Sequence, residues 1–230
     1  GAGFGVLTWD WRGTGDSRPA RLRGFPATMR DWATKDLAGA ISWAEARAPA
    51  GAALLGVGHS FGGQAMGLAP NRDRLRALVT VAAQSGYFGH WPAPARYGYA
   101  LLWHVGMPVL ARAVGYFPAH RLGLGEDLPR GVALEWARWC RRPEYLGDWS
   151  GHAAFAAPLL TVGFDDDPIA PPRAVEALHV RYGSPDKRRR QVRAEELGVR
   201  RIGHFGFFRP TAEPLWREVV EWVEGQGLRD

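Results

Sequence analysis

The chain has 230 residues, of which 46% are hydrophobic and 23% are charged. That length is enough for one large core, and the lack of a periodic repeat or low-complexity tract excludes repeat arrays and fibrous proteins. The net charge is +6, carried by scattered arginines. The densest basic run, residues 187–190, has no interleaved aromatics and lies next to a Gly-Ser-Pro turn. We therefore expect a solvated loop there and no nucleic-acid partner.

The single cysteine, Cys140, cannot form an internal disulfide, so nothing indicates an oxidising compartment. No apolar run approaches the roughly 20 residues that a membrane-spanning helix needs. We therefore expect a cytoplasmic protein without a membrane span, in which Cys140 is a packing residue beside Trp139. The histidines at 59, 90, 104, 120 and 152 are too dispersed for a metal site, and no phosphate-binding glycine loop occurs, so we expect no metal or cofactor.

The first part of the chain alternates apolar runs with helical spacing. Residues 4–9 form a short apolar run that predicts a buried strand, and residues 12–19 predict a loop. Apolar residues then recur at helical spacing over 29–46, with Asp31 as the N-cap or a first-turn acid. A second apolar run, residues 52–58, predicts another buried strand.

A glycine-rich segment follows this second strand. Residues 60–68 predict a helix closed by Pro70, and the glycines in it make sense only if the helix packs very close to a neighbour. Residues 75–82 predict a third strand.

Residues 84–155 break the alternation and hold five of the eleven tryptophans. Two helical stretches stand out, at about 95–115 and about 131–142. We expect the first to be interrupted at Gly106-Met107-Pro108, because proline kinks or ends a helix. This block predicts an inserted helical cap whose aromatic residues line an apolar cavity over Ser60.

Alternation resumes in the last third of the chain. We predict a strand at 159–163, a helix at 172–182, a short strand near 191–194 and a closing amphipathic helix at 212–224. Strands separated by helices indicate an α/β fold with a mainly parallel sheet in an α/β/α sandwich. The predicted organisation is a first core part at 1–83, the cap at 84–155, and a second core part at 156–230.

Gly58-His59-Ser60-Phe61-Gly62 matches G-x-S-x-G between a predicted strand and helix, the context in which this pattern forms a nucleophile elbow. Such a turn is so sharp that side chains at Gly58 and Gly62 would collide with neighbouring backbone. It exposes the Ser60 hydroxyl above the sheet, at a helix N-terminus that favours developing negative charge. The alternative is a plain turn with Ser60 as an N-cap.

A serine nucleophile needs a base, and the base needs an orienting acid. In folds with this elbow the chain order is Ser, acid, His. Only His179 and His204 follow the acidic cluster at 165–167. We assign His204, in a glycine-flanked loop, as the general base, and expect His179 to be a surface or satisfied helix residue. Asp167 is the predicted acid from its spacing to the following Pro-Ile-Ala-Pro, with Asp166 as the second candidate.

Four ordered motifs resemble the α/β-hydrolase superfamily over nearly the whole chain: residues 10–17 (DWRGTGDS), 59–64 (HSFGGQ), 166–171 (DDPIAP) and 202–208 (IGHFGFF). Together with 121–127 (RLGLGED) they look more specifically like a group of bacterial predicted serine hydrolases that are lipase/esterase-like or serine-aminopeptidase-like. The resemblance implies that the backbone N–H of Phe61 is one oxyanion-hole donor. It also implies that the superfamily's first three strands and first helix, with the second donor, would precede residue 1. We therefore expect a truncated chain that is poorly soluble or weakly active.

These features predict a serine hydrolase that acts on a small carboxylic ester or related acyl compound through an acyl-enzyme. The aromatic cap favours an apolar acyl or aromatic group. Two alternatives stay open: an acyltransferase that uses the same Ser60, Asp167 and His204, and a non-catalytic binding module on the same fold. Epoxide hydrolases and haloalkane dehalogenases are disfavoured, because they need Asp where Ser60 stands.

Overall fold

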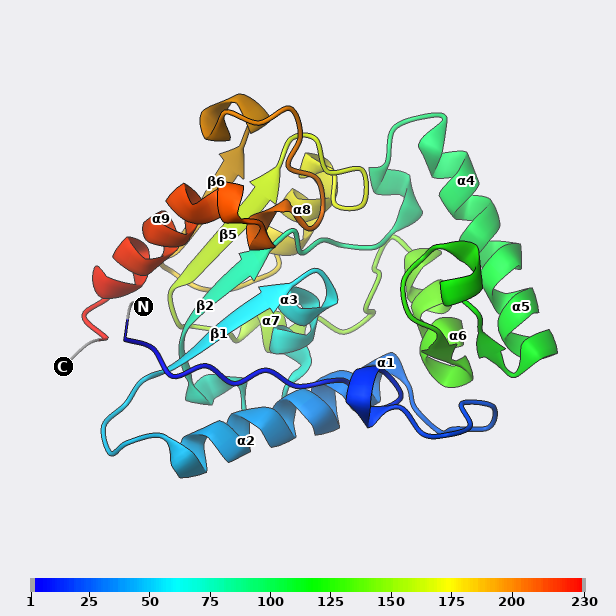
Figure 1. The fold of residues 1–230 in the computed structure, drawn as a ribbon, viewed down its shortest axis with the longest axis horizontal. Helices are drawn as coiled ribbons and strands as arrows, with labels where there is room; N and C mark the ends of the chain where they lie inside the picture. The colour runs from blue at the N-terminus through cyan, green and yellow to red at the C-terminus, as the bar shows by residue number, and fades with distance from the viewer. Residues whose placement is uncertain (1–2, 229–230) are drawn as a thin grey trace. The chain divides into compact units, whose positions relative to one another are not determined.

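A computed structural model describes residues 3–228 (Figure 1). Its contacts divide the chain into two compact units. We call the first the sheet unit; it comprises residues up to 6, 41–85 and those from 149 onward. The second, the helical unit, comprises residues 7–40 and 86–148. Residues 7–40, which the sequence analysis places in the core, thus group by their contacts with most of the predicted cap.

The sheet unit is built on four parallel strands in the order β1-β2-β5-β6. These are β1 (Leu54–His59), β2 (Leu75–Val81), β5 (Leu159–Phe164) and β6 (Lys187–Val192). Parallel strands must be joined by crossover connections, which is why the strands are separated by helical segments in the sequence. The predicted α/β fold with a mainly parallel sheet is confirmed.

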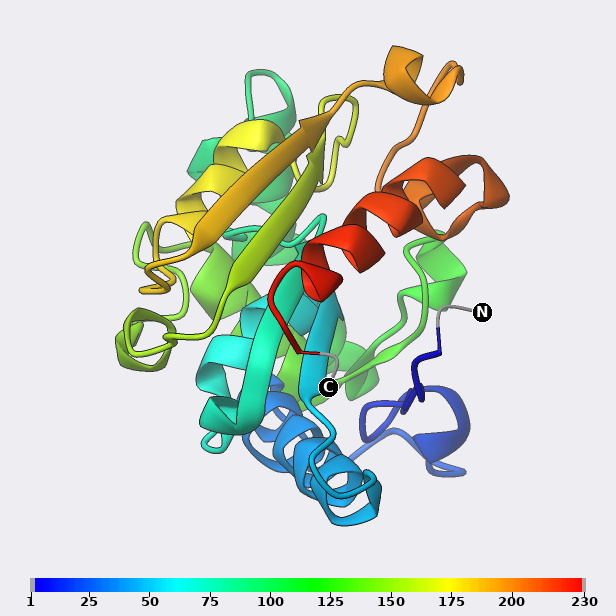
Figure 2. The ribbon, with the colours of Figure 1, turned by 90° about the vertical axis from the view of Figure 1, so that its left-hand side faces the viewer.

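Helices cover both faces of this sheet (Figures 1 and 2). On one face, α9 (Glu213–Glu224) packs its apolar stripe onto alternate residues of β2 and β5, including Val79 and Val162. On the other face lie α3 (Phe61–Ala65) and α8 (Pro172–His179). Shorter segments connect these elements: η3 (Met66–Leu68), η4 (Arg72–Arg74), α7 (Ser150–Ala153), η8 (Ala194–Leu197), η9 (Gly206–Phe208) and η10 (Pro210–Ala212).

A continuous helical stretch links the two units along the chain. It consists of α1 (Met29–Asp31), the π-helical η2 (Trp32–Leu37) and α2 (Ala38–Arg47). Thr28 caps it through a reciprocal capping box with Asp31. The predicted helix at 29–46 is confirmed, and Asp31 is its first-turn acid.

The helical unit contains α4 (Ala95–Leu101), η6 (Leu102–Gly106), α5 (Met107–Val114) and α6 (Arg130–Cys140). Its short elements are η1 (Gly15–Ser17), η5 (Phe88–His90), η7 (His120–Leu122), and the two-stranded antiparallel pair β3 (Tyr116–Phe117) and β4 (Leu128–Pro129). The predicted interruption at Gly106-Met107-Pro108 is wrong. The helix continues through a π-helical η6, which widens the turn where Pro108 would otherwise clash with the carbonyl four residues earlier.

Aromatic packing holds this unit together. Ring centroids lie 4.8 Å apart for Trp91 and Tyr99, 6.4 Å for Tyr99 and Trp103, and 4.9 Å for Trp103 and Trp136. These separations are those of favourable offset or tilted aromatic pairs. Trp91, Tyr99, Trp103 and Trp136 therefore form a continuous aromatic cluster within the helical unit. None of the helices within residues 3–228 is long and apolar enough to cross a membrane.

The predicted strand at 4–9 is wrong: these residues belong to no strand of the described chain. Val6 is 83% exposed. An apolar run is a strand only when another strand pairs with its backbone, and no described strand does so here.

The predicted solvated loop at 187–190 is also wrong, because these residues form most of β6. Among the strands of residues 3–228, β6 pairs with β5 alone, so it is an edge of the described sheet. Arg189 pairs with Glu176, and Arg190 pairs with Glu196 and Glu218. An edge strand with charged side chains lacks the apolar alternation that marks a strand in a sequence, but such charges are common on edges.

Candidate active site

The turn after β1 holds Ser60 in a strained backbone conformation, with φ 50° and ψ −118°. A non-glycine residue with positive φ is uncommon and costs roughly 1–3 kcal/mol, so the surrounding structure must hold it in place. The Ser60 amide donates to the Val81 carbonyl (2.9 Å), and its carbonyl accepts from the Gly63 amide (3.1 Å). Ser60 therefore sits, half-buried, between the end of β1 and the start of α3.

Two glycines allow this turn to form. A Cβ on Gly58 would lie 2.5 Å from the Gly63 nitrogen, and one on Gly63 would lie 2.5 Å from the Ala83 Cβ. A Cβ on Gly62 would meet nothing within 4 Å. The predicted close packing is therefore confirmed for Gly58 and wrong for Gly62, and Gly63 has the second tight position.

The turn after β5 holds Asp167 against His204. The His204 Nδ1 lies 2.7 Å from Asp167 Oδ2, and both residues are buried. Asp167 Oδ1 accepts from the amides of Ile169 (2.8 Å) and Ala170 (3.0 Å). Both carboxylate oxygens are thus satisfied, and the group is oriented by its own loop.

Asp166 has a different role in the same turn. Its carboxylate accepts from the amides of Ile202 (2.7 Å) and Gly203 (2.9 Å). It therefore holds the backbone that leads into His204, whereas Asp167 holds the His204 ring. Asp165 is exposed.

The His204 loop also contacts the residue that precedes Ser60. The His59 Nε2 lies 2.8 Å from the His204 carbonyl oxygen, and the two ring centroids are 4.7 Å apart. Within residues 3–228, no hydrogen bond joins the Ser60 hydroxyl to the His204 ring.

The Alpha/beta hydrolase family matches residues 1–213 of the sequence. The chain belongs to this family. A comparison with curated proteins finds no match.

Solved structures agree with the family fold. A monoacylglycerol lipase from Paleococcus ferrophilus has a TM-score of 0.61 at 19% identity, over 98% of this chain and 85% of its own. The putative non-heme bromoperoxidase BpoC from Mycobacterium tuberculosis has a TM-score of 0.58 at 21% identity, over 95% and 81%. A thermophilic esterase from Thermogutta terrifontis has a TM-score of 0.56 at 20% identity, over 94% and 78%. The TM-scores show a shared fold, and at identities this low the likeness shows the fold alone.

In this α/β hydrolase, two further residues singled out in the sequence, His179 and Cys140, lie outside the candidate site. His179 is buried, and its Nδ1 contacts the Thr161 hydroxyl at 2.9 Å. Burial lowers the pKa of His179. Cys140 is buried in the helical unit, where burial raises the pKa of its thiol, so it is a packing residue and a poor nucleophile. For His179 the satisfied helix residue is therefore confirmed and the surface position is wrong, and for Cys140 the predicted packing role is confirmed.

Sequence reasoning missed the contribution of His59. His59 occupies the variable position before Ser60 in G-x-S-x-G, and the pattern assigns no role to that position. Burial lowers the pKa of His59, and the His204 carbonyl opposes that effect. Its place immediately before Ser60 was the available signal, because the last residue of β1 lies next to the turn that holds Ser60.

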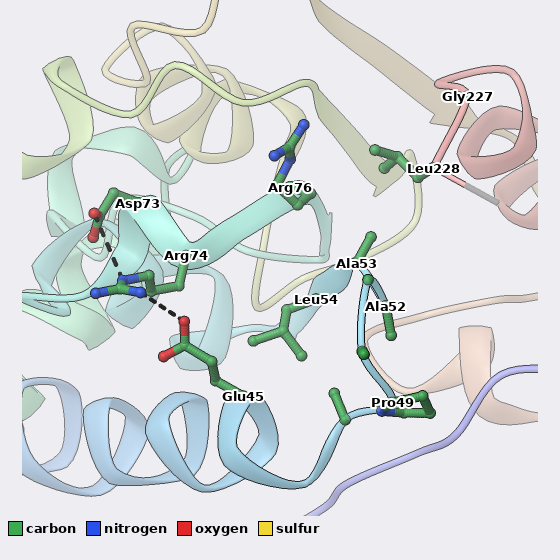
Figure 3. Close-up of a pocket in the computed structure, with 13 residues that line it drawn as sticks. Glu45, Pro49, Ala52, Ala53, Leu54, Asp73, Arg74, Arg76, Gly227 and Leu228 are labelled. Carbon is green, nitrogen blue, oxygen red and sulfur yellow. Dashed lines mark hydrogen bonds and ion pairs between the residues drawn. The ribbon is translucent and has the colours of Figure 1, made fainter. Parts of the chain in front are cut away.

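A hollow of about 580 Å³ lies elsewhere in the sheet unit (Figure 3). Figure 3 shows Arg74 between Glu45 and Asp73, near the first residues of β1 and β2. Ser60 and His59 are at the opposite end of β1, so this hollow contains none of the candidate catalytic residues. In the described part of the chain, no group of three or more His, Cys, Asp or Glu side chains is placed to hold a metal ion.

Proposed function

We propose that this α/β hydrolase is a serine hydrolase that cleaves carboxylic esters or related acyl compounds, with Ser60 as nucleophile, His204 as general base and Asp167 as orienting acid. The observation that carries the proposal is the 2.7 Å contact between His204 Nδ1 and Asp167 Oδ2. A buried carboxylate bonded to one ring nitrogen leaves the other nitrogen to accept a proton, which is the function of the acid in a triad.

The proposed reaction follows from these positions. Asp167 only accepts hydrogen bonds, so His204 carries its proton on Nδ1 and keeps a free electron pair on Nε2. His204 Nε2 takes the Ser60 proton as the hydroxyl oxygen attacks the ester carbonyl. The tetrahedral oxyanion is held by the Phe61 amide at the start of α3. His204 then protonates the leaving alcohol, and water resolves the acyl-enzyme by the same proton path.

The choice of an ester substrate draws on the structural neighbours. Among them are the monoacylglycerol lipase, the thermophilic esterase, and Est1E from Butyrivibrio proteoclasticus with bound ferulic acid. These names belong to those proteins. They support an acyl substrate here by analogy of fold, together with the strained turn at Ser60 in this chain.

The proposal is tested by labelling the protein with a fluorophosphonate probe that reacts with activated serines. We expect one modified residue, Ser60, identified by mass spectrometry of the digested protein. The Ser60→Ala variant should not be labelled, while Ser150→Ala, which changes a serine at the start of α7, should label like the wild type. A folded wild-type sample that does not react, or reacts equally after Ser60→Ala, would overturn the proposal.

A further inference from the structure

We propose that His59 is a positioning residue that holds the His204 loop against the nucleophile strand. The inference rests on the proposed function, because it concerns the alignment of His204 with Ser60. His59 touches the base and its loop, whereas the reacting atoms belong to Ser60 and His204.

The hydrogen bond from His59 defines its protonation. The His59 Nε2 lies 2.8 Å from the His204 carbonyl oxygen. A carbonyl oxygen can only accept, so His59 must carry a proton on Nε2 and donate it. The bond therefore runs from the last side chain of β1 to the main chain of the proposed general base.

Ring contacts support the same attachment. The His59 ring centroid lies 4.7 Å from that of His204, 5.3 Å from Phe205 and 5.2 Å from Phe208. The loop over 204–208 thus packs around one imidazole. Aromatic contacts at these separations add to the hydrogen bond.

The other attachments of this loop come from a different strand. Asp166 binds the amides of Ile202 and Gly203, and Asp167 binds the His204 ring; both follow β5. In the sheet, β2 lies between β1 and β5. Among the described residues of β1, His59 alone makes a hydrogen bond to this loop. Asp166 and Asp167 therefore orient His204 relative to β5, and His59 relates it to Ser60.

Loss of the His59 donor should mainly slow proton transfer. Misplacing a catalytic group by about 1 Å can cost roughly 100-fold in rate. The bond between His204 and Asp167 does not involve His59, so the ring should keep its acid while losing its alignment with Ser60.

The first experiment compares two substitutions that separate the hydrogen-bond donor from the aromatic ring. His59→Phe keeps a ring and removes the N–H, whereas His59→Gln keeps an N–H and removes the ring. We expect the maximal rate of fluorophosphonate labelling to fall about 10- to 100-fold in His59→Phe, with unchanged probe affinity, and to recover most of its value in His59→Gln. The control is His104→Phe, which removes a histidine contact to the Ala100 carbonyl in the helical unit and should label at the wild-type rate.

The second experiment needs neither reaction nor a folded variant. In wild-type protein with ¹⁵N-labelled histidine, NMR reports which ring nitrogen of His59 carries the proton. We expect the Nε2–H form, with slow exchange of that proton with water. A His59 ring protonated only on Nδ1 would overturn the inference whatever the enzyme does.

The outcomes separate this inference from the proposed function. If the wild type labels at Ser60 and His59→Phe labels equally fast, the positioning role is wrong and the proposed function stands. If the wild type does not label, the proposed function fails; the His59 protonation state then still decides whether the hydrogen bond to His204 exists. Slow labelling of His59→Phe, recovery in His59→Gln and an Nε2–H proton together support the inference.

Discussion

The turns after β1 and after β5 each hold one part of the candidate site, but by opposite means. The turn after β1 holds Ser60 in a strained conformation that is possible because Gly58 and Gly63 lack side chains. The turn after β5 is held by carboxylates: Asp166 and Asp167 accept from four backbone amides and one ring N–H.

This difference shows two ways of fixing a side chain of the candidate site. In the turn after β1, backbone packs closely against backbone, so the turn tolerates no added side-chain volume, and its stability does not depend on charge. Carboxylates bonded to amides depend on ionised acceptors, because charge-assisted hydrogen bonds are about twice as strong as neutral ones. Substitutions that add volume should therefore damage the first turn, and those that remove charge should damage the second.

The largest expected effect is on activity, from removing the charge of Asp167. Asp167→Asn keeps an oxygen for the Ile169 and Ala170 amides but presents an amide to His204, which selects the wrong ring tautomer. We expect kcat for ester hydrolysis to fall about 10⁴-fold with little loss of stability, as in other triads. Asp165→Asn removes a neighbouring exposed charge and should leave kcat unchanged; an equal loss in both variants would contradict the assignment of the acid.

Added volume in the turn after β1 should affect folding first. Gly58→Ala places a Cβ 2.5 Å from the Gly63 nitrogen, so the backbone must move. We expect a loss of about 1–3 kcal/mol in the free energy of unfolding, measured by urea denaturation. Gly62→Ala is the matched control: its Cβ meets open space within α3, and alanine is up to about 1 kcal/mol better than glycine in a helix. Equal destabilisation by both would refute the steric account of this turn.

Loss of the Asp166 carboxylate should loosen the His204 loop. Asp166→Ala leaves the amides of Ile202 and Gly203 without their acceptor. Unsatisfied buried donors cost roughly 1–3 kcal/mol each, less where water reaches them, so we expect a moderate loss of stability. Hydrogen exchange should then be faster at these two amides and unchanged in β2; unaltered protection would show that Asp166 does not hold the loop.

The smallest expected effect is the response of stability to acid. Burial lowers the pKa of both His59 and His179 in the folded protein. The unfolded chain therefore binds protons first as the pH falls below about 6.5, and the free energy of unfolding decreases. We expect lower urea midpoints at pH 5.5 than at pH 7.5, with a shallower dependence in His179→Gln. A urea midpoint that does not change between pH 5.5 and pH 7.5 would contradict this prediction.

The candidate site could be predicted from the sequence where the local residue pattern and the folded structure agree. Ser60 could be singled out because G-x-S-x-G stands between an apolar strand and a glycine-rich helix. The need for a sharp, closely packed turn explains the pattern, the strand before it and the glycines after it. His204 could be proposed from chain order. The choice between Asp166 and Asp167 rested on spacing alone, since two adjacent carboxylates differ only in which backbone and ring groups the folded chain brings to them.

Other features depended on neighbours that are distant in the sequence. Residues 4–9 have the composition of a strand but no described pairing partner, whereas residues 187–190 have the composition of a loop and pair with β5. Gly62 and Gly63 are indistinguishable in the sequence, and only the position of Ala83 shows which one must lack a side chain. The π-helical turn before Pro108 is likewise a response to packing that local propensity does not contain.

The basic strand β6 has a consequence for how the molecule behaves in a crowded solution. A sheet edge presents unpaired amides and carbonyls that can recruit a strand from another chain and start aggregation. Here that edge carries four consecutive cationic side chains, and Arg188 is largely exposed. Two copies approaching through this edge would bring like charges together. Charged edge strands of this kind disfavour strand addition, so we expect this edge to resist pairing with a second copy.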